Sequence, residues 1–84
     1  MSEIMAASFG EHIKQRRKEL GFPLRKVAAH IDIDTSTLGK IEREERNIPQ
    51  YSLAKLAEIL ETNEEELATL YFTSKVFEEL TEYL

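Results

Sequence analysis

The stretch from Leu24 to Arg43, LRKVAAHIDIDTSTLGKIER, decides the fold of this 84-residue chain. Two short segments with helical spacing of apolar residues flank the polar break Asp32-Ile33-Asp34. Helices joined by so short a turn must cross steeply and still bury a common face. The apolar residues that this requires are Val27, Ile31, Ile33, Leu38 and Ile41, with the small Ala28 at the close approach. The joint match predicts two short helices that pack across a tight turn.

A further helix precedes this pair. It is expected to begin after Ser8, which together with Glu11 forms a capping box. Its apolar positions are Phe9, Ile13 and Leu20, and Gly21 ends it. Pro23 suits the start of the next helix.

More helices follow the pair. Residues 44–50 are expected to form a loop, and residues 53–60 carry apolar residues at the i, i+3, i+4, i+7 positions of a fourth helix. Asn63 and Glu66 form a second capping box that opens a fifth helix. A last amphipathic stretch from Val76 to Leu84 is either a sixth helix or a continuation of the fifth. The fold class predicted is therefore all-α.

Length and composition limit the class of protein. A chain of 84 residues predicts one domain. It contains no cysteine, and two isolated histidines do not predict a metal site. No run approaches the ~18 apolar residues of a membrane span, and no signal peptide is recognised. We expect a cytoplasmic protein that needs neither metal nor cofactor. We also expect that it is not an enzyme, because no nucleophile, base and orienting group converge on a motif.

The charge is distributed unevenly. The chain has a net charge of −5. Residues 1–50 contribute nine Lys or Arg against eight Asp or Glu, whereas residues 51–84 contribute two against eight, so the halves carry +1 and −6. What matters for nucleic acid is a basic face rather than the total charge.

Several motifs resemble the Cro/repressor-type helix-turn-helix family, also called the XRE family. They are Phe9-Gly10, Arg17-Lys18-Glu19-Leu20-Gly21, Val27-Ala28, Ser36-Thr37-Leu38-Gly39-Lys40-Ile41-Glu42-Arg43 and Glu45-Arg46-Asn47. The resemblance covers roughly residues 8–70. It implies a compact five-helix, lambda-repressor-like helix-turn-helix domain over 8–70, whose third helix enters the major groove of double-stranded DNA. We expect residues 1–7 to form a flexible arm and residues 71–84 an additional amphipathic C-terminal helix.

The third helix is expected to read DNA with its outward face. With Leu38 and Ile41 facing inward, Ser36, Lys40 and Arg43 point the opposite way. Hydroxyl groups can donate or accept hydrogen bonds, and a lysine reaches guanine acceptors. The predicted base contacts are Thr35, Ser36, Thr37, Gly39 and Lys40, with Gly39 allowing close approach of the backbone. The predicted phosphate contacts are Arg25, Arg43, Arg46 and Asn47.

A second pair of residues has a structural interpretation. Arg17 lies eight residues after Phe9, and Glu42 lies four after Leu38, so both fall on inward edges of their helices. Members of the family commonly carry an Arg–Glu pair at the matching positions. We predict a partly buried ion pair between Arg17 and Glu42 that orients the third helix.

The C-terminal stretch is too apolar for a free tail. We predict that it forms a homodimer interface from Phe72, Val76, Phe77, Leu80, Tyr83 and Leu84. Packing on its own domain and binding a different protein are the alternatives. A homodimer would place two recognition helices on an inverted repeat, with repression as the expected outcome in a bacterial or phage-type setting at the nucleoid, and with no small-molecule ligand.

Some positions depart from the family pattern. Asp32 and Glu44 stand where the family usually has glycine, and Leu24 stands where it often has a phosphate-binding glutamine. The turn position of Asp32 often needs a positive φ, which Asp tolerates better than most residues. The rival hypothesis is a protein-interaction adaptor or antitoxin that keeps the fold and binds DNA weakly or not at all.

Overall fold

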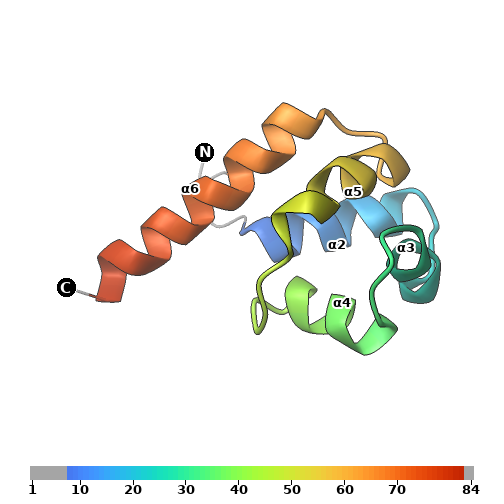
Figure 1. Cartoon of the computed structure of the whole chain (residues 1–84), viewed down its shortest axis with the longest axis horizontal. Coiled ribbons are helices and arrows are strands. Elements are labelled where there is room, and N and C mark those ends of the chain that lie inside the picture. Colours follow the sequence, from blue (N-terminus) through green and yellow to red (C-terminus); the bar gives the residue numbers. More distant parts are fainter. Residues whose placement is uncertain (1–7, 83–84) are drawn as a thin grey trace.

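The computed structural model describes residues 8–82, without the side chains of residues 77, 78, 81 and 82. Its elements, in chain order, are α2 (Phe9–Glu19), α3 (Leu24–His30), α4 (Thr35–Glu42), the 3-10 turn η1 (Gln50–Ser52), α5 (Leu53–Ile59) and α6 (Glu64–Glu82). Residues 8–82 thus contain five α-helices and no strand, which confirms the predicted all-α class (Figure 1).

One apolar core holds these helices together. Leu38 and Ile41 of α4 are 0% and 1% exposed, and they pack with Ile13 of α2, Val27 of α3 and Leu56 of α5. Burying side chains of this size contributes about 1.5–3 kcal/mol each. The first half of α6 closes the core, where the ring of Tyr71 meets that of Phe9 edge to face at 4.9 Å. The predicted apolar stripes face this core, with Leu20 and Ile33 only partly buried.

Side-chain caps fix the starts of two helices. The Ser8 hydroxyl accepts a hydrogen bond from the Glu11 amide at 3.2 Å, and the Asn63 side-chain oxygen Oδ1 accepts one from the Glu66 amide at 3.0 Å. Both bonds satisfy amides that have no partner within their helix. Asp34 occupies the N-cap position of α4, but its side chain makes no capping hydrogen bond.

Helices α2 to α5 all end in the same backbone motif. Two turn amides bond back to the last helical turn, as when the amides of Gly21 and Phe22 bond the carbonyls of Lys18 and Arg17. The motif requires one left-handed residue after each helix. That residue is Gly21, Asp32, Glu44 or Glu61, with φ of 75°, 61°, 64° and 56°. Three of the four helices therefore stop at a residue with a side chain, and the positive φ expected at Asp32 is observed.

Replacing Glu61 with glycine is expected to stabilise the protein by about 1 kcal/mol. A left-handed conformation costs a residue with a Cβ roughly 1–2 kcal/mol, and the glycine loses part of this gain to unfolded-state entropy. Urea unfolding followed by circular dichroism measures the change. As a control, Ala54→Gly inside α5 should destabilise by roughly 0.5–1 kcal/mol. A decrease in stability for Glu61→Gly would contradict this explanation of the helix end.

Helix α6 is one continuous element, so the C-terminal stretch continues the fifth helix rather than forming a separate one. Figure 1 shows its second half extending away from the other helices. Its first half buries Leu67 and Tyr71, whereas Phe72, Val76 and Leu80 are 42%, 56% and 59% exposed. Within residues 8–82, no helix is both long enough and apolar enough to cross a membrane.

Candidate nucleic-acid interface

The outward face of α4 is open to solvent. Thr35, Ser36 and Lys40 are exposed, while Leu38 and Ile41 on the opposite face lie in the core. Ala28 of α3 is buried in the same core, which is consistent with its expected place at the close approach of α3 and α4. The helix therefore presents two hydroxyl groups and one ammonium group on a rigid support.

Two other residues predicted to contact bases are less exposed than Thr35, Ser36 and Lys40. Thr37 is only partly exposed, and Gly39 is buried. A Cβ added at Gly39 would lie 3.5 Å from Leu24 Cδ2 and 3.3 Å from Arg43 Nη1. Gly39 thus leaves space for Leu24 of α3 and for Arg43, the C-cap residue of α4. The structure does not place it on the open surface where close approach to a groove was expected.

The four predicted phosphate contacts are all exposed: Arg25, Arg43, Arg46 and Asn47. Arg43 and Asn47 have protein partners that the sequence did not predict. The Arg43 Nε lies 3.3 Å from a carboxylate oxygen of Glu45. The side-chain oxygen of Asn47 accepts a hydrogen bond from the Lys75 ammonium group of α6.

Arg17 and Glu42 join α2 to α4 through two parallel hydrogen bonds. Arg17 Nε donates to Glu42 Oε2 at 2.8 Å, and Arg17 Nη2 donates to Glu42 Oε1 at 3.1 Å. The two side chains are 12% and 6% exposed. Arg17 Nη1 also donates to the Phe22 carbonyl at 3.0 Å. This geometry satisfies both charged groups and fixes the end of α4 against α2.

A second contact between α2 and the end of α4 involves Glu44. Its carboxylate accepts a hydrogen bond from the Gly10 amide in the first turn of α2. A Cβ at Gly10 would lie only 2.4 Å from the Glu42 carbonyl oxygen, so the approach needs glycine at this position. The left-handed backbone of Glu44 is therefore accompanied by a contact that a glycine there would not make.

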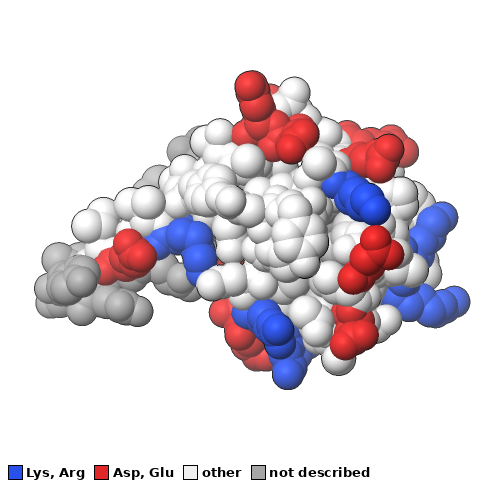
Figure 2. Space-filling view, viewed as in Figure 1, with Lys and Arg blue, Asp and Glu red and all other residues white. Residues whose placement is uncertain are grey.

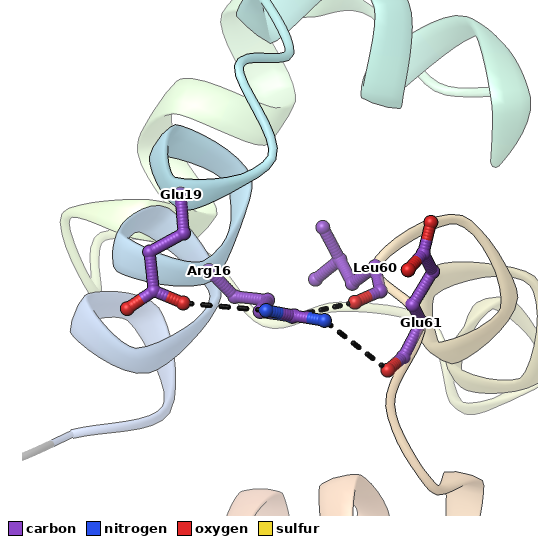
Figure 3. Close-up of polar contacts among 4 residues, drawn as sticks. All are labelled: Arg16, Glu19, Leu60 and Glu61. Carbon is purple, nitrogen blue, oxygen red and sulfur yellow. Dashed lines mark hydrogen bonds and ion pairs between the residues drawn. The ribbon is translucent and has the colours of Figure 1, made fainter.

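Arg16 has an internal role that sequence analysis missed (Figure 3). Its Nε donates to the Leu60 carbonyl at 2.8 Å and its Nη2 to the Glu61 carbonyl at 3.5 Å, while Nη1 lies 3.3 Å from Glu19 Oε1. A cation at a helix C-terminus satisfies free carbonyls and interacts favourably with the helix dipole. The sequence groups Arg16 with other basic residues, but the structure uses it to hold the end of α5.

Helix α6 contacts the loop that follows α4. The Tyr71 hydroxyl donates to the Ile48 carbonyl at 3.3 Å, one turn of α6 before the bond from Lys75 to Asn47. Two neighbouring turns of α6 thus donate hydrogen bonds to two neighbouring residues of the loop. The direction of α6 is consequently fixed relative to the surface that carries Arg43 and Arg46.

The charges on the molecule are segregated only in part. Figure 2 shows acidic side chains at the top, around the start of α6, where the first turn contains Glu64, Glu65 and Glu66. Lysine and arginine lie along the right and lower edges, near α3 and α4, with some acidic side chains among them (Figure 2). The surface around α4 is therefore less acidic than the chain's net charge of −5 suggests.

Comparison with known proteins identifies relatives of this chain. Among solved structures it is similar to the restriction-modification controller protein C.AhdI from Aeromonas hydrophila, with 30% identity and a TM-score of 0.64 over 70% of this chain and 89% of that one. It is also similar to the N-terminal DNA binding domain of SinR from Bacillus subtilis, with 33% identity and a TM-score of 0.63 over 71% of this chain and 88% of that one. No curated protein matches significantly.

A family model agrees with these structures and with the resemblance to Cro/repressor-type proteins. The helix-turn-helix model HTH_3 matches residues 13–67, which is more than half of the chain. The matched range contains the whole of α3, α4 and α5, together with the turn between α3 and α4. The chain therefore belongs to the helix-turn-helix family HTH_3.

Proposed function

We propose that this protein is a sequence-specific DNA-binding transcriptional regulator whose helix α4 enters the major groove. The observation that carries the proposal is the open face of α4, with Thr35, Ser36 and Lys40 exposed above the buried Leu38 and Ile41. Hydroxyl and ammonium groups are suited to the donors and acceptors on base edges. Membership of the helix-turn-helix family supports the proposal, as do the two similar structures, a controller protein and a DNA binding domain.

Phosphate contacts in this proposal come from four exposed residues, Arg25, Arg43, Arg46 and Asn47. Arginine side chains beside a recognition helix hold the duplex in register without reading its sequence. The Arg17–Glu42 pair supports these contacts indirectly, because it holds the end of α4 against α2.

The regulator is proposed to act as a homodimer on an inverted repeat. Phe72, Val76 and Leu80 recur every four residues along the second half of α6, and all three are exposed. A second copy of this helix would cover them and place two α4 helices on half-sites about 34 Å apart. Phe77, Tyr83 and Leu84, predicted for the same interface, lie outside the described side chains.

Occupancy of a promoter by such a dimer would block transcription, so repression is the proposed outcome. The place of action is proposed to be the bacterial cytoplasm, at the nucleoid or on a phage genome. The similarity to C.AhdI makes control of a restriction-modification system a specific candidate setting.

A second candidate function is that of a protein-interaction adaptor or antitoxin with weak DNA binding. The observation that favours it is charge: the chain carries −5 overall, and Glu44 and Glu45 directly follow the recognition helix. Repulsion between these carboxylates and the phosphates would make DNA binding weak or absent.

Replacing Lys40 with alanine is expected to weaken binding to a selected operator by about ten- to a hundredfold. One good base contact is worth about 1–3 kcal/mol of discrimination. Operators are first selected from a random-sequence duplex library, and the affinity is then measured by fluorescence anisotropy. Binding to random duplexes should change little, because Lys40 is proposed to read bases.

Two further variants complete this experiment. Arg43→Ala should weaken binding to every duplex and reduce the slope of log K against log salt by up to about 0.9. Lys18→Ala, an exposed position on α2, should change affinity only slightly and equally for all sequences. If no duplex is selected and none binds at low salt, the adaptor is favoured over the regulator.

A further inference from the structure

We infer that Glu45 competes with DNA for Arg43 and thereby restrains the affinity of the interface. The inference rests on the proposed function and assigns a residue that regulates the same site. Arg43 Nε lies 3.3 Å from Glu45 Oε2, and Arg43 Nη2 donates to Glu45 Oε1 at 3.3 Å. Both edges of the carboxylate group thus face the guanidinium group, and the two side chains are 57% and 55% exposed.

The backbone fixes where this carboxylate lies. The Glu45 amide donates to the Lys40 carbonyl at 2.8 Å, which is part of the motif that ends α4. The preceding residue, Glu44, has the left-handed conformation that turns the chain back toward the helix. Glu45 is consequently held beside the last turn of α4 by a hydrogen bond of its own main chain.

The Arg43 guanidinium group also lies close to Gly39 of α4. Its Nη1 lies over Gly39, since a Cβ there would be 3.3 Å from it. The guanidinium group therefore runs back along α4, between the backbone of Gly39 and the carboxylate of Glu45. Arg43 and Lys40 are both exposed and three residues apart, on the surface that is proposed to face DNA.

A phosphate group needs the same donors that Glu45 occupies. Arginine binds carboxylate and phosphate through the same pair of parallel hydrogen bonds. A duplex must therefore displace the carboxylate or share the guanidinium with it, and the displaced negative charge stays near the phosphate. Both effects oppose binding to any sequence, so Glu45 limits occupancy of random DNA as well as of the operator.

The neighbouring Glu44 provides a matched control. It carries the same charge one residue earlier, but its carboxylate accepts a hydrogen bond from the Gly10 amide of α2. Within residues 8–82 this carboxylate pairs with that amide and with no arginine. Neutralising Glu44 removes an equal charge from the chain and leaves the Arg43–Glu45 pair in place.

The test compares Glu45→Gln with Glu44→Gln in wild-type and Arg43→Gln backgrounds. Dissociation constants are measured by fluorescence anisotropy for a selected operator and a random duplex over a series of salt concentrations. Glu45→Gln should tighten binding to both duplexes by about three- to tenfold, and steepen the slope of log K against log salt by up to about 0.9. In the Arg43→Gln background, the gain should fall below about twofold, because no guanidinium group remains to be released.

Three results would overturn the inference. These are an unchanged affinity in Glu45→Gln, an equal gain in the Arg43→Gln background, and an equal gain from Glu44→Gln, which would reduce the effect to total charge. Each of these presupposes that the wild-type protein binds DNA. A wild-type protein that binds no duplex would instead overturn the proposed function, which is a distinguishable outcome. Circular dichroism of each variant checks that α4 and the rest of the fold are retained.

Discussion

Glu42→Ala is expected to lower the free energy of unfolding by about 3–5 kcal/mol, the usual cost of leaving one member of a buried ion pair without its partner. Arg17 would keep its charge in a position that is 12% exposed, and of its hydrogen-bond acceptors within residues 8–82 the Phe22 carbonyl alone would remain. A domain of this size has a total stability of about 4–13 kcal/mol. The loss is therefore large enough to unfold part of the population, and urea unfolding followed by circular dichroism measures it.

Two controls test whether the loss of stability comes from leaving a buried charge unpaired. The double variant Arg17→Met/Glu42→Leu should recover most of the lost stability, because apolar side chains of similar volume replace a buried pair at little cost. Glu58→Ala removes the hydrogen-bond partner of His30 in a contact whose side chains are 71% and 40% exposed, and should change stability by no more than about 1 kcal/mol. A loss below 1 kcal/mol for Glu42→Ala would show that the Arg17–Glu42 pair does not support the fold.

Val76→Glu/Leu80→Glu is expected to convert the proposed dimer to a monomer and to weaken binding to the full inverted repeat by about 100-fold or more. Each substitution would bury a carboxylate in the interface, which is costly without a partner. Loss of the second half-site removes the effective concentration that links the two binding events, worth about 10²–10⁴ in affinity. Sedimentation equilibrium measures the oligomeric state, and fluorescence anisotropy measures the affinity.

The half-site duplex makes this prediction specific. Binding of the double variant to a single half-site should equal that of the wild-type monomer, because α4 is unchanged. Gln15→Glu, at an exposed position on α2, adds one of the same negative charges and should leave the dimer intact. A wild-type protein that sediments as a monomer at high concentration, or a double variant that remains dimeric, would contradict the role assigned to α6.

The parts of the fold that depend on local pattern follow from the sequence. The spacing of Leu38 and Ile41 indicates which face of α4 is buried, and the structure buries that face completely. Ser8 and Asn63 indicate where two helices begin, because a capping side chain bonds an amide only two or three residues away. The sequence left open whether a helix ends between Tyr71 and Val76. Continuity is consistent with the absence of any glycine or proline after Pro49.

The parts that depend on tertiary side-chain contacts do not follow from the sequence. Gly39 faces α3 because Leu24 and Arg43 fill the space beside it, and no spacing rule states this. In the sequence, Arg16 is indistinguishable from the other basic residues of its segment. Its role appears only when the fold brings the carbonyls at the end of α5 to the guanidinium group. The partners of Arg43 and Asn47 likewise depend on how the loop after α4 folds back and on where α6 crosses it.

The central claim is that the exposed face of α4 contacts the duplex. Its most direct test is the titration of ¹⁵N-labelled protein with the selected operator, followed residue by residue through amide NMR signals. We predict the largest shifts at residues 35–43 and in the following loop to residue 47, with signals of the first turn of α6 nearly unchanged. Shifts confined to α5 and α6, with the signals of Ser36, Lys40 and Arg43 unmoved at saturation, would contradict the claim.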